Sequence, residues 1–135
     1  MTKHQIPSLV FGGLVFLGHW ALGIGHSPMH SIALVTAPDL AVARQLARGV
    51  LENRLAACVN LGPGVESHYW WEGKLCREGE VLMVLKTTKA RLAALEEFVL
   101  AAHPYDTPEF LVFKIESGSR KYFEWIGASV EGAGE

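Results

Sequence analysis

The chain has 135 residues, half of them apolar and 19% charged, and its formal net charge is -2. This length supports one domain with a modest core, and the absence of a basic cluster argues against a nucleic-acid partner. Two cysteines, Cys58 and Cys76, are too few for a disulfide framework and lack the spacing of a metal motif. We expect Cys58 to be a small core residue.

The N-terminal segment differs from the rest of the chain because residues 6–25 contain no Asp, Glu, Lys or Arg. This apolar run and the small-residue triplet Ala21-Leu22-Gly23 predict a signal or membrane segment for the secretory pathway. A retained anchor, a mitochondrial leader and a core helix are the alternatives. We therefore divide the chain into a targeting segment with linker (1–27), a folded domain (28–131) and a polar tail (132–135).

The domain begins with an apolar strand over residues 32–36 and a helix that follows Asp39. Asp is favoured at a helix N-cap, and the residues after it have the spacing of a helix with one buried face. The apolar positions are Leu40, Ala43, Leu46, Ala47, Val50 and Leu51.

Residues 55–88 predict two strands joined as one long antiparallel hairpin. The runs at 56–61 and 81–85 are almost free of charge, which favours central strands buried on both faces. Gly62-Pro63-Gly64 predicts a bulge or bend, because Pro cannot donate a ladder hydrogen bond and Gly tolerates unusual dihedrals. The hairpin is expected to turn at Glu72-Gly73-Lys74.

The arm over residues 65–75 carries Tyr69, Trp70 and Trp71. Three adjacent aromatic side chains have more apolar area than a small monomer usually leaves in water. We therefore expect this arm to be an interface in an oligomer.

A second helix is predicted after Thr88, which can cap it, and it should end near His103 because a proline follows. A two-proline loop over 103–109 leads to a last strand over 110–115, and Gly118-Ser119 opens a terminal helix. The apolar stripe of the second helix is Leu92, Leu95, Val99 and Ala102, and one side of the terminal helix carries Tyr122, Trp125, Ile126, Ser129 and Val130.

This order of elements predicts an α+β fold, a ferredoxin-like βαββαβ sandwich with an added C-terminal helix and a long protruding β-hairpin. Right-handed crossovers place both main helices on one face of the four-stranded sheet. The other face is also apolar, and a second copy of the chain is its expected cover.

Catalytic motifs are absent from the sequence, so we expect neither an enzyme nor a required cofactor. The best candidate site is the 103–109 loop, where His103 lies near Glu109, with Asp106 and Tyr105 between them. Imidazole and carboxylate groups suit copper, zinc or another divalent cation. His68, beside the aromatic arm, is a further candidate ligand.

A structural role explains the same residues. His103 at a helix end can hydrogen bond backbone carbonyls, and Glu109 and Tyr105 can then form a subunit contact. On the residues alone, this structural role is favoured. His26 and His30 flank the linker, where they are either further candidates for weak copper binding or inert.

Several motifs then identify a family that the chain resembles. In chain order they are VTAPD (35–39), ENRLAACVNL (52–61), YWWEGK (69–74), EVLMVLKTT (80–88) and HPYDTPE (103–109), followed by Tyr122 and Trp125. Together they resemble the CutA divalent-cation tolerance family, and the leader is similar to those of animal members. The resemblance implies a ferredoxin-like protomer in a homotrimer whose hairpins pair between subunits. We assign five residues to that interface: Tyr69, Trp70, Trp71, Tyr105 and Trp125.

The resemblance also implies binding of copper or another divalent metal ion, and a role in metal tolerance. Bacterial members linked to copper carry a Cys where this chain has Val35, which removes a soft ligand, and the family usually lacks a Cys at the position of Cys76. We therefore expect a mixed nitrogen and oxygen site at His103 that prefers Cu(II) over Zn(II).

Two alternatives to metal binding stay open. One is a non-catalytic trimeric scaffold that assists the localisation or membrane anchoring of a protein client such as acetylcholinesterase, as implied for animal members. The other is a small-ligand sensor with clefts between subunits, similar to P-II trimers.

Overall fold

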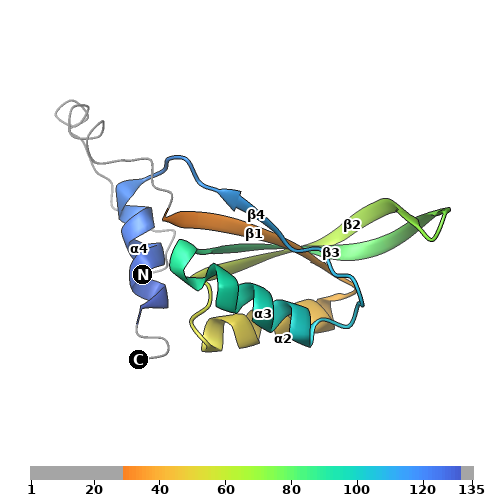
Figure 1. Cartoon of the computed structure of the whole chain (residues 1–135), viewed down its shortest axis with the longest axis horizontal. Helices are drawn as coiled ribbons and strands as arrows, with labels where there is room; N and C mark the ends of the chain where they lie inside the picture. Colours follow the sequence, from red (N-terminus) through yellow and green to blue (C-terminus); the bar gives the residue numbers. More distant parts are fainter. Residues whose placement is uncertain (1–28, 132–135) are drawn as a thin grey trace.

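A computed structural model describes residues 29–131, and the predicted targeting segment and tail lie outside this range (Figure 1). The strands form one antiparallel sheet in the order β2-β3-β1-β4, which confirms the ferredoxin-like fold. The strands are β1 (His30–Ala37), β2 (Cys58–Trp71), β3 (Lys74–Thr88) and β4 (Leu111–Lys114). The helices are α2 (Leu40–Glu52), α3 (Leu92–Ala102) and α4 (Arg120–Val130), with a short 3₁₀ helix, η1 (Lys89–Arg91), before α3.

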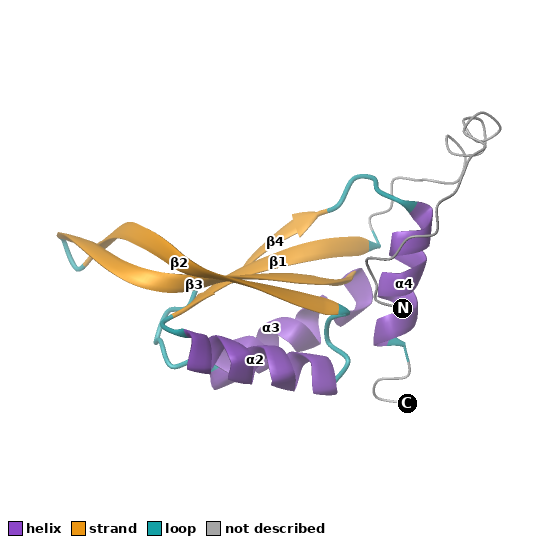
Figure 2. Ribbon diagram, turned by 180° about the vertical axis from the view of Figure 1, so that it is seen from behind, coloured by secondary structure: helices purple, strands orange, loops and turns teal. Residues whose placement is uncertain are grey.

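Helices α2 and α3 cover one face of the sheet, and α4 lies at the end of the sheet opposite the hairpin tip (Figures 1 and 2). The core lies between this face and the two helices, where alternate residues of β1 and β3 are buried. Its main members are Ala33, Val35, Ala37, Val81, Met83 and Leu85 from the sheet, and Ala43, Leu46, Val50, Leu95 and Val99 from the helices. None of the helices within residues 29–131 is long and apolar enough to span a membrane.

The other face of the sheet keeps apolar side chains at its surface. Leu111 and Phe113 of β4 are half-exposed and pair in register with Leu34 and Ile32 of β1. The proposed cover for this face, a second copy of the chain, stays a prediction.

The hairpin of β2 and β3 extends beyond the body of the domain, as predicted (Figure 1). A register shift between Gly62 and Val65 confirms the expected bulge, and Gly64 there has a φ of 81°. At the tip, Glu72 and Gly73 both have positive φ, at 50° and 79°. Two such residues form a tight turn whose twist matches that of antiparallel strands.

Strand β2 is an edge strand of the described sheet, so its predicted central position is wrong. The chain inserts β3 between β1 and β2, and this leaves the run at 56–61 paired on one side only. Cys58 is accordingly half-buried, with its Sγ 3.7 Å from Asn60 Oδ1, and is not the core residue we expected.

Two of the three α-helices, α2 and α4, begin at a side chain that accepts a backbone N–H of the first turn. Asp39 Oδ1 accepts the Val42 N–H at 2.9 Å, and Ser119 Oγ accepts the Tyr122 N–H at 3.3 Å. The predicted Thr88 cap is wrong, because Thr88 makes no capping side-chain hydrogen bond and is still the last paired residue of β3. The chain instead enters α3 through η1.

Candidate functional site

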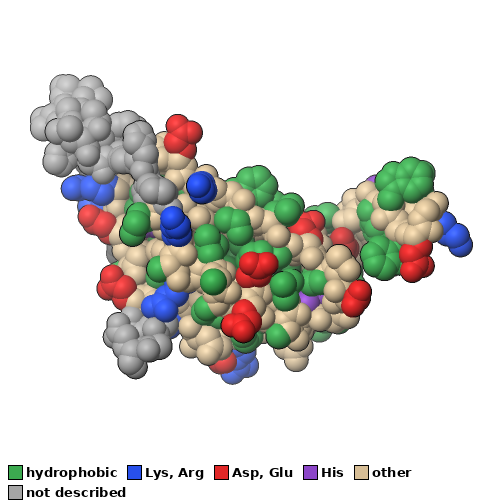
Figure 3. Space-filling model, in the orientation of Figure 1, with side chains coloured by type: hydrophobic (Ala, Val, Ile, Leu, Met, Phe, Trp, Pro, Cys, Tyr) green, Lys and Arg blue, Asp and Glu red, His purple; other side chains and the backbone are tan. Residues whose placement is uncertain are grey.

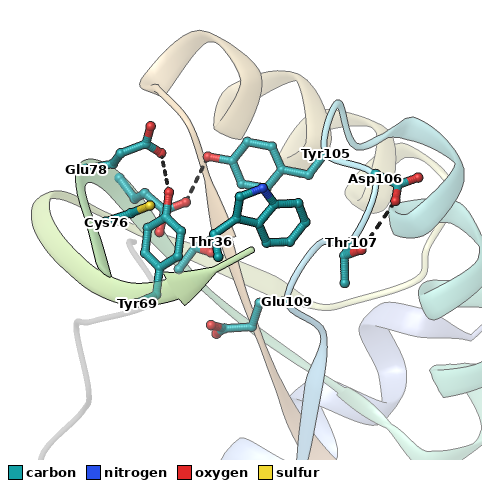
Figure 4. A pocket seen from close by; sticks show the side chains of 10 residues that line it. Thr36, Tyr69, Cys76, Glu78, Tyr105, Asp106, Thr107 and Glu109 are labelled. Carbon is teal, nitrogen blue, oxygen red and sulfur yellow. Dashed lines mark hydrogen bonds between the residues drawn. The ribbon is translucent and has the colours of Figure 1, made fainter. Parts of the chain in front are cut away.

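A pocket of about 460 Å³ lies between the hairpin and the 103–109 loop (Figure 4). Strands β1, β2 and β3 form one side of it and the loop forms the other. The lining residues are Thr36, Tyr69, Trp71, Cys76, Glu78, Glu80, Tyr105, Asp106, Thr107 and Glu109.

The alternation of side chains along the hairpin brings its residues to this pocket. Tyr69 and Trp71 are two residues apart on β2, and Tyr69 lies opposite Cys76 on β3. Glu78 and Glu80 follow Cys76 at the same spacing, which keeps the three side chains on one face of β3. This alternation was the signal in the sequence for Glu78 and Glu80, which we did not predict as site residues.

Two tyrosine hydroxyl groups donate hydrogen bonds to these carboxylates (Figure 4). Tyr69 donates to Glu78 Oε1 at 2.8 Å, and this bond raises the pKa of Tyr69 to about 12. Tyr105 donates to Glu80 Oε2 at 2.9 Å, and burial together with this bond raises the pKa of Tyr105 above its usual range. Both phenols are therefore protonated at neutral pH, and Tyr105 ties the loop to β3.

The pocket is negatively charged. Its lining includes four acidic residues and no Lys, Arg or His. The two ion pairs within residues 29–131, Arg48 with Glu52 and His68 with Glu66, are made by residues outside this lining. Burial, and after it the charge of Glu80, raises the pKa of Glu109. No basic side chain of the lining offsets this charge.

His103 lies beside the pocket but does not line it. Its side chain is buried, with 7% of the residue exposed, and both ring nitrogens have backbone partners. Nε2 is 2.8 Å from the carbonyl oxygen of Thr36, and Nδ1 accepts the Tyr105 N–H at 3.1 Å. This pattern requires the proton on Nε2, and a metal ion must displace one of the two partners to bind the ring. These backbone hydrogen bonds are of the kind expected if His103 has a structural role at the end of α3.

The other predicted metal ligands are only partly brought together. Glu109 and Asp106 both line the pocket, and the Thr107 hydroxyl lies 3.5 Å from Asp106 Oδ2. His68 does not line it and instead lies 2.7 Å from Glu66 with a 65% exposed side chain. Within residues 29–131, no three His, Cys, Asp or Glu side chains are arranged to hold a metal ion.

The remaining predicted residues occupy separate regions. Tyr69, Trp71 and Tyr105 line the pocket, whereas Trp70 is 70% exposed on the arm, where apolar side chains are visible in Figure 3. Trp125 lies on α4, with its ring centroid 5.3 Å from that of Tyr122.

Neither Val35 nor His30 lines the pocket. Val35 is fully buried in the core. The His30 ring stacks on Phe123 at 4.2 Å, and His26 lies outside the described residues.

The fold and the pocket together define a ferredoxin-like α+β protein with a long hairpin and an acidic, aromatic pocket beside it. The family model described as CutA1 divalent ion tolerance protein matches residues 31–129, and the chain belongs to this family.

Named relatives agree with this assignment. The divalent-cation tolerance protein CutA of Escherichia coli is 50% identical over 99 residues, which are 73% of this chain and 88% of that protein. Mouse protein CutA is 45% identical over 107 residues, 78% of this chain but only 60% of the mouse protein. The structure of CutA from Synechococcus elongatus superposes with a TM-score of 0.76 at 35% identity, covering 80% of this chain and 96% of that one.

Proposed function

We propose that this protein is a non-catalytic homotrimer that binds divalent cations, copper among them, and contributes to metal-ion tolerance. The observation that carries the proposal is the unbalanced negative charge of the pocket, to which Glu78, Glu80, Asp106 and Glu109 contribute. Carboxylate oxygens attract divalent cations, and the names of the bacterial relatives refer to tolerance of such ions.

A metal site of this kind needs ligands beyond those that one described chain brings together. Glu109 and Asp106 supply oxygen atoms, and His103 can join them only by releasing Thr36 or Tyr105. The exposed ring of His68 lies on the projecting hairpin, and we expect it to be the further ligand that one subunit offers to its neighbour. Trimer formation and metal binding are therefore coupled in this proposal.

Calorimetric titration of the full-length chain with Cu(II) and Zn(II) tests the proposal. Copper should bind more tightly than zinc, because sites with nitrogen and oxygen ligands generally have a higher affinity for Cu(II) than for Zn(II). Glu109→Gln should weaken the binding of both metals. Glu97 is an exposed residue of α3, and its variant Glu97→Gln should bind both metals with the affinity of the wild type. If neither metal binds the wild type, the proposed metal role is wrong.

The role of His103 needs its own variant. His103→Ala should weaken copper binding if the ring turns to the metal, and circular dichroism should confirm that the variant is folded. If the folded variant binds copper as the wild type does, His103 is a structural residue only, with the contacts to Thr36 and Tyr105 as its role.

A scaffold function is favoured by a separate observation, the exposed apolar tip of the hairpin. Trp70 and Leu75 face each other across the two strands and are 70% and 71% exposed. Such a surface fits another subunit or a protein client. If the trimer forms without these side chains, a client such as a membrane-anchored enzyme becomes the favoured occupant.

A further inference from the structure

We propose that the end of the domain opposite the hairpin tip docks on a bilayer surface that contains anionic phospholipids. This end consists of residues 29–31, 86–91 and 114–131, and we call it the α4 end (Figure 1). The inference is independent of the proposed metal function, which belongs to the pocket beside the hairpin.

Charge is unevenly distributed between the two ends of the domain. The α4 end has six basic residues and three acidic ones, whereas the hairpin arm and the loop (65–80 and 103–109) together have six acidic residues and two basic ones. The formal net charge of -2 for the whole chain conceals this difference. The basic residues of the α4 end are Lys86, Lys89, Arg91, Lys114, Arg120 and Lys121, and its acidic residues are Glu116, Glu124 and Glu131.

The fold gathers these basic residues from separate parts of the chain around the start of β1. The Lys89 N–H donates to the Met29 carbonyl oxygen at 2.7 Å, and Lys114 is the register partner of Ser31. Helix α4 packs against the same start of β1 through its first turn. Lys and Arg side chains are visible at this end in Figure 3. The sequence has no basic cluster because the contributing segments are far apart along the chain.

The positive charge of the α4 end is not neutralised by ion pairs. None of its six basic residues makes an ion pair with another residue of the described range, 29–131. Arg91 donates instead to the backbone carbonyl oxygen of Val130, through Nε at 3.0 Å and Nη2 at 2.7 Å. Arg120 and Lys121 lie in the first turn of α4, where the helix dipole disfavours positive charge. A negatively charged partner would give these positions a favourable interaction that they lack in the isolated domain.

The position of the uncharged N-terminal segment favours a membrane as this partner. Residues 6–25 contain no Asp, Glu, Lys or Arg, and four residues lead from Gly25 to Met29. Four fully extended residues span at most about 14 Å. A bilayer that holds residues 6–25 therefore lies within about 14 Å of the α4 end, a distance comparable to the Debye length of about 8–10 Å. Exposed basic side chains this close to a membrane are attracted to anionic headgroups.

A nucleic acid is the other common partner of a basic surface, and it fits less well. The three acidic residues among the six basic ones interrupt the kind of basic stripe that tracks a phosphate backbone. A nucleic acid also leaves the adjacent apolar segment unexplained. Membrane binding accounts for both, because an apolar element and a basic surface together hold a protein at a bilayer more firmly than either alone.

The proposed surface is compatible with the proposed trimer. None of the six basic residues is among those assigned to the subunit interface. On α4, Trp125 of that interface is half-buried, with its ring centroid 5.3 Å from that of Tyr122, whereas Arg120 and Lys121 are exposed. The subunit interface and the membrane surface therefore use different side chains.

Vesicle flotation of the full-length chain tests this inference. In the presence of a chelator, the chain is mixed with vesicles of phosphatidylcholine alone or with vesicles in which a third of the lipid is phosphatidylserine. The apolar segment contributes to both partition coefficients, so their ratio reports the basic surface. Each basic residue contributes about fivefold, and an excess of three should give a preference of about a hundredfold for the anionic vesicles that falls with added salt. Equal partition into both kinds of vesicle would overturn the inference.

Removal of charge at each end of the domain locates the surface. Lys114→Gln combined with Lys121→Gln should lower the preference for anionic vesicles about 25-fold. Lys74→Gln combined with Arg77→Gln removes the same charge from the exposed hairpin tip and should keep the preference of the wild type. Equal losses in the two double variants would show an effect of net charge alone and would contradict docking through the α4 end.

A second pair and a nucleic-acid probe complete the test. Lys89→Gln combined with Arg120→Gln should cause the same loss as the first pair, which guards against a local folding defect. Binding of a short DNA duplex without a preference for anionic vesicles would identify a nucleic acid as the partner and overturn the inference. Copper titration of these variants should match the wild type, so failure of this inference leaves the proposed metal function in place.

Discussion

Glu109 places a negative charge where the folded chain disfavours it. Its pKa is raised by burial and then by the charge of Glu80, so the ionised carboxylate is less stable in the folded chain than in the unfolded one. The resulting loss of stability is absent below the ordinary glutamate pKa of about 4.3. It develops as the pH rises through the raised pKa of the folded state and is complete above it.

We therefore expect Glu109→Gln to raise the free energy of unfolding at pH 7 and to have less effect at pH 4. Urea unfolding at the two pH values measures this difference. Glu97→Gln, on the exposed side of α3, is the control and should show no such dependence on pH. A Glu109→Gln variant that is less stable than the wild type at pH 7 would mean that the carboxylate stabilises the fold.

At the scale of elements, α2 and α3 pack closely at one glycine. A Cβ atom added to Gly49 would lie 3.0 Å from Phe98 Cε1, with the tip of the same ring closer still. In α4, a Cβ added to Gly127 would have no neighbouring atom within 4 Å. The two helical glycines therefore form a matched pair that differs in the room available for an added Cβ atom.

Alanine at Gly127 should stabilise the protein by about 0.5–1 kcal/mol, because alanine favours a helix. At Gly49 the same gain is opposed by overpacking against Phe98, which typically costs about 1–3 kcal/mol, and a net loss of about 1 kcal/mol is expected. Thermal unfolding of the two variants compares them directly. Equal stabilisation by both substitutions would show that the Phe98 ring moves aside at little cost.

At the scale of the whole molecule, the hairpin projects beyond the body and carries the most exposed large apolar side chains of the described residues, Leu75 and Trp70. The uncovered sheet face adds the half-exposed Leu111 and Phe113. Burial of such surfaces between copies of the chain is favourable, at roughly 25 cal/mol for each Å² of apolar area. This is the physical basis for the proposed trimer.

Replacing both Trp70 and Leu75 by serine should weaken the trimer and leave the pocket residues in place. Light scattering of the wild type should give three times the protomer mass of 14.8 kDa, and the double variant should give a lower mass. Leu100→Ser removes an exposed leucine from α3, away from the arm, and should leave the mass unchanged. A double variant that keeps the trimer mass would show that the arm is not required for assembly.

Local chemistry was enough to predict the element order and most element boundaries. Asp39 and Ser119 bond to a backbone N–H three residues later, and the Glu72-Gly73 turn joins directly adjacent strands. Each of these features depends on residues that are close in the sequence, so caps and turns can be predicted from the residue types at those positions. Apolar spacing similarly predicted the buried faces of the helices, as with Ile126 and Val130 of α4.

The candidate site depended on long-range contacts that no local pattern reports. The partner of His103 is the backbone carbonyl of Thr36, 67 residues away, and any residue type at that position has such a carbonyl. Tyr105 meets Glu80 only because β3 lies between β1 and β2, and the same sheet order makes β2 an edge strand. Apolar runs show that a strand is buried but not which strands lie beside it. The pocket lining and the role of His103 were therefore decided by tertiary packing, because the pairing order of the sheet determines which distant side chains meet.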